Sequence, residues 1–174
     1  MDSNRLRLYG SLMCNIFIEL EHNKVQQGIC NLEKKINKTI PLPQKILLSV
    51  TGTLENTISI LIGSETEVKI LEQDDFIDVI YRSVNIVQKQ DGKVLVNAKS
   101  KIYPHYLPHN VVKKIRDQKE SIGSIIESEK LETFRRIHAL GYNHLEKNFT
   151  KNYHIIHKQN IVFKIQEIFI TEFR

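Results

Sequence analysis

A long β-hairpin from Ile77 to Pro104 constrains the fold of this chain more than any other stretch. Two runs rich in β-branched residues flank a Gln90-Asp91-Gly92 turn, which is typical of hairpins. A two-residue loop would place two cations, Arg82 and Lys101, opposite each other. A three-residue loop with Gly92 in the left-handed region forms a bulge and pairs Arg82 with Ser100. The same register pairs Val84 with Ala98 and Ile86 with Val96. It matches the two apolar faces, so we expect it.

Arg82 is a cation on a face of the hairpin that is otherwise apolar. Alternation along the strand puts its side chain on the same face as Ile80, Val84 and Ile86. An unpaired buried charge costs several kcal/mol, so we expect an anionic group to meet the guanidinium. The plainer interpretations are a structural ion pair, or a cation that reaches water at the edge of the sheet.

The last predicted hairpin carries a lone charge of the opposite sign. It runs from Asn152 to Phe173 and turns at Lys158-Gln159-Asn160. Glu167 is the only charged residue in a row of apolar side chains on its second arm. A direct ion pair with Arg82 would account for both charges. So would a shared cavity that holds a polar ligand between them.

Six strands are expected, within an α+β fold. They span residues 66–72, 77–89, 93–103, 131–140, 152–157 and 161–171, and Gly141 is expected to end the fourth. A helix pair surrounds the Thr51-Gly52-Thr53 break, where Thr53 is a good N-cap residue and Gly63 a C-terminal cap. Two short helices follow Pro108 and Ser121.

The first 45 residues are assigned only loosely, within a single domain that spans 1–174. Leu12–Leu20 fits a helix or a strand, and its interruption by a polar residue and a charge argues against a signal peptide. Asn23–Lys38 fits a helix that Pro41 and Pro43 end. A chain of 174 residues is long enough for one core, which buries about two-thirds of the unfolded surface.

Charge and hydropathy narrow the range of partners. The formal net charge is +5, but the basic residues are dispersed and do not alternate with aromatic residues, so no nucleic-acid partner is expected. No stretch approaches the roughly 18 apolar residues of a membrane span, so no membrane partner is expected either. A small dianionic metabolite fits this charge. The sequence leaves a monomer and a dimer equally open.

Metal and redox motifs are absent from the sequence. Cys14 and Cys30 are expected to be free thiols, buried or half-buried, in a reducing compartment. Two histidine pairs lack a third ligand at metal spacing, namely His105 with His109 and His154 with His157. There is no phosphate loop and no nucleophile elbow. An enzyme with this sequence is therefore expected to use no metal or cofactor and to rely on a carboxylate and a guanidinium.

Several features follow one another in a distinctive order. They are the helix pair at Thr51-Gly52-Thr53, the hairpin arm with Arg82, the segment SKIYPHYLP, the element Ser121-Ile122-Gly123, the strand with Thr133 and Arg135, and the QEIF core at Glu167. Their order and spacing resemble the chorismate pyruvate-lyase family, including its plastid-encoded and mycobacterial-type branches, over roughly residues 46–172.

The resemblance implies a six-stranded antiparallel sheet with helical flaps that close over an internal ligand site. It implies release of pyruvate from chorismate, which leaves 4-hydroxybenzoate, without metal or cofactor. The product would feed quinone synthesis or another pathway, in the cytoplasm or the plastid stroma. The flaps would be residues 44–63 and 110–130, called here the first and second flap.

The resemblance also implies roles for particular residues. It maps the carboxylate-binding arginine onto Arg82, the catalytic acid onto Glu167 and a backbone donor onto Ile122. The remaining candidates for substrate binding are Gly123, Arg135, which would meet the second carboxylate, and Thr53. This chain departs from the family pattern at Ser121, where the family element carries a proline.

Two other interpretations stay open. Some transcription regulators contain a non-catalytic domain of this fold, which binds a small molecule such as an aromatic acid without turnover. A structural protein with a buried Arg82–Glu167 pair would bind nothing at all.

Overall fold

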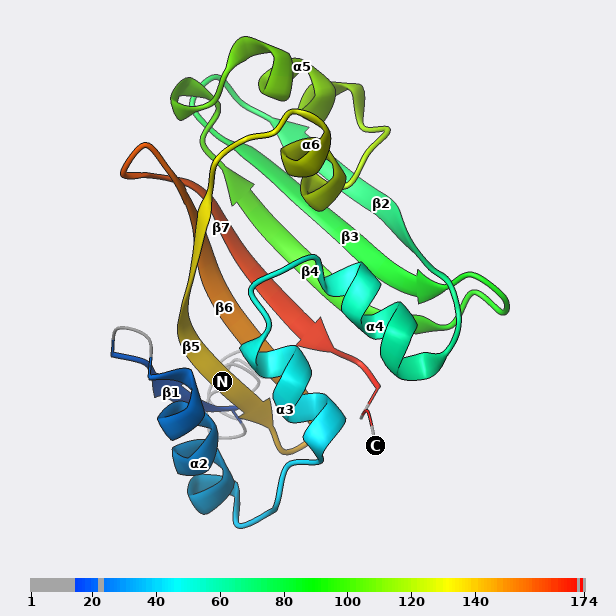
Figure 1. The fold of residues 1–174 in the computed structure, drawn as a ribbon, viewed down its shortest axis with the longest axis vertical. Coiled ribbons are helices and arrows are strands. Elements are labelled where there is room, and N and C mark those ends of the chain that lie inside the picture. The colour runs from blue at the N-terminus through cyan, green and yellow to red at the C-terminus, as the bar shows by residue number, and fades with distance from the viewer. Residues whose placement is uncertain (1–14, 22–23, 172, 174) are drawn as a thin grey trace, which may run out of the picture.

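An antiparallel sheet with helices packed over one face forms the framework of the molecule (Figure 1). The computed structural model describes residues 15–21, 24–171 and 173. The strands are β1 (Asn15–Glu19), β2 (Thr66–Asp75), β3 (Ile80–Gln88), β4 (Val94–Ile102), β5 (Phe134–Asn143), β6 (Asn148–His157) and β7 (Asn160–Phe169). The helices are α2 (Val25–Ile36), α3 (Leu42–Ser49), α4 (Leu54–Ile62), α5 (His109–Asp117) and α6 (Ile122–Ser128), with a 3-10 turn η1 (Pro104–Tyr106).

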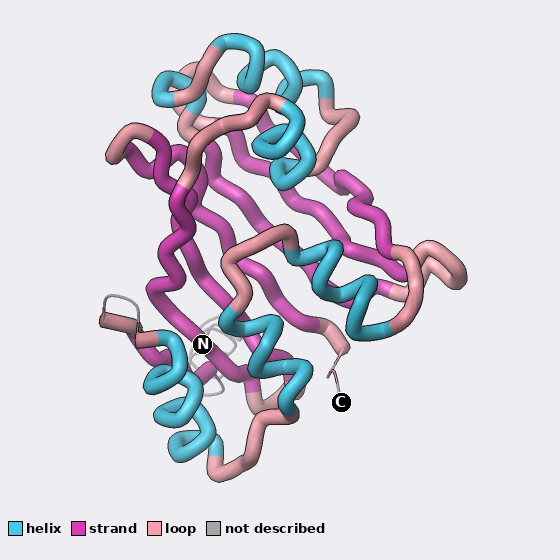
Figure 2. Tube along the Cα trace, viewed as in Figure 1, coloured by secondary structure: helices cyan, strands magenta, loops and turns pink. Residues whose placement is uncertain are grey.

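The strand order in the sheet is β1-β5-β6-β7-β4-β3-β2. Because β7 lies between β6 and β4, the last strand of the chain joins the two halves of the sheet. Helices α3 and α4 belong to the first flap, and α5 and α6 to the second; both pairs lie over the same face (Figure 2). Helix α2 packs against β1 and β5.

The β3–β4 hairpin has the register expected from the sequence. Arg82 pairs with Ser100, Val84 with Ala98, and Ile86 with Val96. Gly92 adopts a φ of 73° and its N–H donates to the Gln88 carbonyl over 2.9 Å. The register shifts between Ile86 and Val87, whose partners are Val96 and Val94, which marks a bulge near the turn end of the hairpin. The lone charge is therefore fixed on the inner face of the sheet, as alternation predicts.

The expected number of strands is wrong, because the described residues form seven. The seventh, β1, falls within the segment for which helix and strand both stayed open, and it pairs with β5. Gly141 does not end β5 either, since that strand continues to Asn143. A Cβ on Gly141 would lie 2.7 Å from Cε1 of Phe17, so glycine here permits the close approach of β1.

Other boundaries also differ from expectation. Strand β2 continues past a bulge to Asp75, and β6 begins at Asn148 rather than Asn152. Helix α2 ends at Ile36 with Asn37 in the left-handed conformation, so the two prolines do not end it. Pro41 and Pro43 instead lie at the start of α3, where a missing N–H costs nothing.

Two further observations concern the thiols and the membrane. Cys30 is exposed, contrary to expectation, while Cys14 lies outside the described residues. No helix in the described part of the chain combines the length and the apolar character needed to cross a bilayer.

The inner face of the sheet places the two lone charges in neighbouring rows. One row runs from Arg82 through Ser100 and Ile165 to Tyr153. The next row runs through Ala98 and Glu167 to Lys151. Two strand spacings and one row separate the α-carbons of Arg82 and Glu167, which is roughly 12 Å.

Candidate functional site

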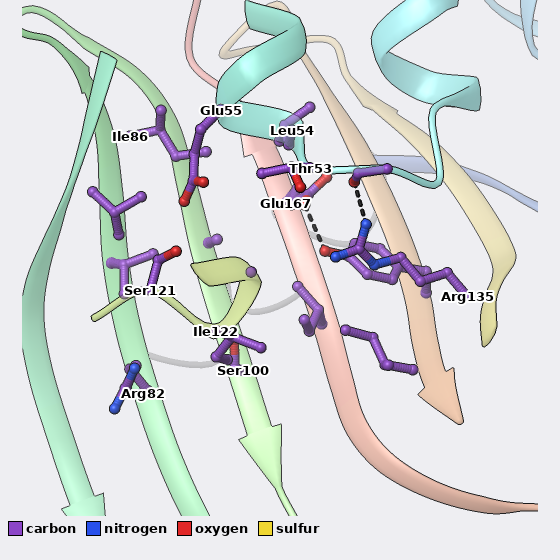
Figure 3. Close-up of a pocket in the computed structure, with 18 residues that line it drawn as sticks. Thr53, Leu54, Glu55, Arg82, Ile86, Ser100, Ser121, Ile122, Arg135 and Glu167 are labelled. Atoms are coloured by element: carbon purple, nitrogen blue, oxygen red, sulfur yellow. Dashed lines mark hydrogen bonds between the residues drawn. The ribbon is translucent and has the colours of Figure 1, made fainter. Parts of the chain in front are cut away.

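Both lone charges line one cavity between the sheet and the two flaps (Figure 3). Its volume is about 70 Å³, which is room for a few water molecules. The residues singled out from the sequence all line it: Thr53, Arg82, Ile122, Gly123, Arg135 and Glu167. Apolar side chains form much of the remaining wall, among them Val84, Ile86, Ile155 and Ile165.

Arg82 is 2% exposed and has no carboxylate partner within ion-pair distance in the described part of the chain. Its Nε donates to Oε1 of Gln73 over 2.7 Å, and Nη1 donates to the carbonyl of Glu120 over 3.1 Å. Nη2 donates to the carbonyl of Ile115, near the end of α5. Burial lowers the pKa of Arg82 to about 10, so the guanidinium remains charged at neutral pH.

These contacts leave capacity for a ligand. A guanidinium carries five N–H groups, and the three contacts use one on each nitrogen. One N–H on each terminal nitrogen therefore remains. A carboxylate is the group that best matches a guanidinium, because it accepts two parallel hydrogen bonds.

Glu167 is 4% exposed and is held by two neighbours on β6. The hydroxyl of Tyr153 donates to its Oε1 over 2.8 Å, and Nζ of Lys151 lies 2.9 Å from its Oε2. Burial, together with the charge of Glu167, raises the pKa of Tyr153 well above its usual value. Tyr153 therefore stays protonated and serves as a donor.

Sequence reasoning did not find Lys151, although a signal for it existed. Lys151 is 2% exposed and pairs directly with Glu167 across the strands. It lies two residues before Tyr153, so alternation places both on one face. The expected strand began one residue after it, at Asn152, and this left Lys151 outside the pattern.

Lys151 and Arg135 attach the first flap to the sheet. Nζ of Lys151 donates to the carbonyls of Leu47 and Val50, over 3.0 and 3.2 Å. Nη1 of Arg135 donates to the carbonyls of Thr51 and Gly52. The Nε of Arg135 is buried without a partner, so this guanidinium too has a free donor.

The N-terminal ends of α4 and α6 meet above the cavity. Thr53 precedes α4, but its side chain makes no capping hydrogen bond. Ser121 caps α6 by accepting from the N–H of Ser124 over 3.1 Å. Ile122 and Gly123 open α6, where N–H groups have no acceptor within the helix. A Cβ on Gly123 would lie 3.6 Å from Cγ2 of Thr53, which shows how closely the flaps approach.

Glu55 is an acidic side chain of the cavity that sequence reasoning missed. It lies in the first turn of α4 and is half-buried. Figure 3 shows Glu55 and Glu167 in the same part of the cavity, with Arg135 beside Glu167 and Arg82 farther away, beyond Ser121. Burial is the largest cause that raises the pKa of Glu55, and the charge of Glu167 raises it further. Helical periodicity places Glu55 beside the apolar row of α4. The sequence does not indicate that the fold brings Glu55 close to Glu167.

Of the two alternatives left open for the lone charges, a direct Arg82–Glu167 ion pair is not found among the described residues. Glu167 pairs with Lys151, whereas Arg82 contacts an amide oxygen and two carbonyls. The other expectation, a shared cavity, describes the observed arrangement. Its wall carries two arginines, the carboxyl groups of Glu55 and Glu167, and apolar side chains.

Comparisons with known proteins identify relatives of this chain. A family model described as Chorismate pyruvate-lyase Rv2949c-like matches residues 48–174. "Putative lyase MJ0807" from Methanocaldococcus jannaschii is 31% identical over 154 residues, which cover 78% of this chain and 83% of that protein.

A solved structure is also similar. The crystal structure of PhnF from Mycobacterium smegmatis aligns over 70% of this chain and 64% of that chain, with a TM-score of 0.49 and 10% identity. A likeness of that degree supports no inference about function. The family match over residues 48–174 confirms the resemblance drawn from the motifs. This chain therefore belongs to the Rv2949c-like chorismate pyruvate-lyase family.

Proposed function

We propose that this protein is a lyase that converts chorismate into 4-hydroxybenzoate and pyruvate. The observation that carries the proposal is Arg82, a buried cation without a carboxylate partner among the described residues, on the wall of a cavity shared with Glu167. A buried charge of this kind is stabilised best by an anion that binds to it. Membership of a lyase family makes a substrate the natural source of that anion.

The two carboxylates of chorismate match the two arginines. Arg82 binds the ring carboxylate through its free N–H pair, helped by the amide of Ile122. Arg135 meets the enolpyruvyl carboxylate with its free Nε–H. Thr53 and Gly123 close the cavity over the substrate from the two flaps. These roles follow from the positions of the side chains and from the family resemblance together.

Glu167 assists proton transfer in the reaction. Its carboxylate accepts a hydrogen bond from the ring hydroxyl as the ether bond breaks and enolpyruvate leaves with the bonding electrons. The ring carbon that carries the hydroxyl loses its hydrogen as a proton, and enolpyruvate takes up a proton at its methylene carbon to become pyruvate. Lys151 and Tyr153 hold this carboxylate in one orientation. The ring becomes aromatic as the bond breaks, so much of the driving force lies in the substrate. The protein has mainly to orient the substrate and exclude water, and no cofactor enters the proposal.

The closed cavity requires the flaps to move during each turnover. A volume of about 70 Å³ is well below the range of roughly 300–1,000 Å³ for ligand pockets. Chorismate therefore enters, and 4-hydroxybenzoate leaves, when the flaps separate from the sheet. Product release then limits the rate, as is common where lids close over a site.

Incubation of the purified protein with chorismate tests the proposal. Chromatography should show 4-hydroxybenzoate and pyruvate released in equal amounts. Turnover should fall at least about 100-fold in Glu167→Gln, since general acid–base groups contribute that much or more. Turnover should fall by a similar factor in Arg82→Lys, because an ammonium group lacks the bidentate geometry of a guanidinium.

Two matched substitutions serve as controls. Arg136→Lys and Glu127→Gln change charged side chains close to the site that do not line the cavity, so they should retain turnover. Thermal unfolding would verify that each variant is folded. Binding of 4-hydroxybenzoate without release of pyruvate from chorismate would identify an effector-binding domain instead. Failure to bind either compound would leave only a structural role.

A further inference from the structure

Glu55 is a carboxyl group of the cavity that the proposed roles do not use. Its side chain reaches the cavity from the first turn of α4. Within the described residues, no lysine, arginine or histidine lies at ion-pair distance from it. Glu167, by contrast, has Lys151 at 2.9 Å. The two carboxyl groups of one cavity therefore differ, because only one of them has a neutralising partner.

The surroundings of Glu55 come from both flaps and from the sheet. Ser121, at the start of α6, interacts with its carboxylate, and a Cβ on Gly123 would lie 3.8 Å from its Oε2. Arg135 on β5 is the cation whose charge favours the ionised form. Glu167 on β7 and Glu127 on α6 oppose it. Burial is the largest influence, and it also opposes the ionised form.

An anionic ligand enclosed beside Glu55 would further disfavour the ionised form of its carboxyl group. Lys151 already neutralises the charge of Glu167. An ionised Glu55 is therefore the carboxylate that would repel a bound dianion. A neutral carboxyl group removes the repulsion and gains a hydrogen-bond donor. The closeness of the flaps leaves little room for water to screen the charges.

We propose that Glu55 determines which ligands the site accepts, by binding a proton as an anion is enclosed and donating a hydrogen bond to that anion. The inference rests on the proposed function only in taking the cavity as the ligand site. It does not require turnover. It assigns to Glu55 a preference for aromatic or cyclic carboxylates over neutral analogues at low pH.

The sign of the pH dependence follows directly. Burial and Glu167 raise the pKa of Glu55 in the free protein, and an anionic ligand raises it further. Binding therefore takes up protons, and affinity falls as pH rises through the pKa of Glu55. Each unit by which the ligand raises that pKa corresponds to about a tenfold loss of affinity across the transition.

Calorimetry with 4-hydroxybenzoate as the probe tests this proposal. Titrations at several pH values, each in two buffers of different ionisation enthalpy, give the number of protons taken up. The wild-type protein should take up a measurable fraction of a proton, and Glu55→Gln should take up none while it still binds. Glu132→Gln removes an exposed carboxylate that neither lines the cavity nor is among the charges acting on Glu55, so it should behave as the wild type.

The outcomes separate the two proposals. Equal proton uptake in the wild type and in Glu55→Gln would overturn the role of Glu55, and so would binding without uptake in the wild type. Binding with Glu55-dependent uptake, but without turnover of chorismate, would support Glu55 while overturning the lyase. Absence of binding to the wild type would overturn both. Carbon-13 NMR of the free protein adds a direct check, since Glu55 should titrate above the ordinary glutamate pKa.

Discussion

Lys151 shows how one residue can stabilise the fold and organise the site together. Its ammonium group contacts the carboxylate of Glu167 and two carbonyls at the end of α3, and it is 2% exposed. Such a buried group is satisfied only while all its partners are in place. Loss of the ammonium would leave a buried carboxylate without a counter-ion and would free the start of the first flap.

The first prediction concerns the free energy of unfolding. Lys151→Met should destabilise the protein by about 3 kcal/mol, because it leaves Glu167 charged and uncompensated in the interior. The double variant Lys151→Met with Glu167→Gln should recover part of this loss, since the orphaned charge is removed as well. Urea unfolding followed by circular dichroism gives the coupling between the two sites.

An exposed lysine on the neighbouring strand provides the comparison for this cycle. Lys164→Met changes the same residue type on β7, where the side chain is exposed, so it should alter stability by less than about 0.5 kcal/mol. Strictly additive effects in the double variant would show that Lys151 and Glu167 are energetically independent.

At the scale of elements, the two flaps meet through very few residues. The second prediction uses the approach of Thr53 to Gly123, where a Cβ on the glycine lies 3.6 Å from Cγ2 of the threonine. Cysteines at both positions should form a disulfide that holds the flaps together. The oxidised protein should then bind 4-hydroxybenzoate far more slowly than the reduced protein, because the ligand cannot pass closed flaps. Stopped-flow mixing measures that rate.

Reduction of the cross-link should restore binding in the same sample. The background protein should carry Cys14→Ser and Cys30→Ser, since Cys30 is exposed and would exchange with the new pair. Equal binding rates before and after reduction would mean that the ligand reaches the cavity by another path.

The sequence predicted those parts of the fold that depend on residues close together in the chain, such as the β3–β4 hairpin. The turn at Gly92 and the avoidance of facing cations determined the β3–β4 register, and the inward charges followed from simple alternation. Strand β1 was not counted among the expected strands, because its five residues fit a helix as well as a strand. Only the pairing with β5 distinguishes the two. The contact from Arg135 to Thr51 spans 84 positions, and nothing near either residue indicates it.

The same limit applies to the site. Arg82 and Glu167 each disturb an apolar pattern, so the sequence marks them individually. Lys151 was missed because the expected strand began four residues late, which left Lys151 one residue outside it. Glu55 was missed because its significance depends on the opposite flap.

In the whole molecule, β7 joins the two halves of the sheet. It is the last strand in the chain, and it pairs with β6 on one side and β4 on the other. The third prediction compares two truncations. Removal of residues 160–174 should abolish cooperative unfolding, because among the described residues β7 alone joins the two halves of the sheet through backbone hydrogen bonds.

Removal of residues 1–21 should be far milder. It deletes β1, an edge strand with one partner, and so should lower the midpoint of urea unfolding while leaving a cooperative transition. A cooperative transition in the protein without residues 160–174 would contradict the central role of β7.

This topology has a consequence for biosynthesis. Until residues 160–169 have been synthesised, the nascent polypeptide holds two β-sheet fragments, β1-β5-β6 and β4-β3-β2, that cannot yet dock through β7. Arg82 is synthesised well before Glu167, so the chamber can assemble only after β7 has emerged. A stalled or prematurely terminated product would expose apolar strand edges, and in the cell it would be a substrate for chaperones and proteases.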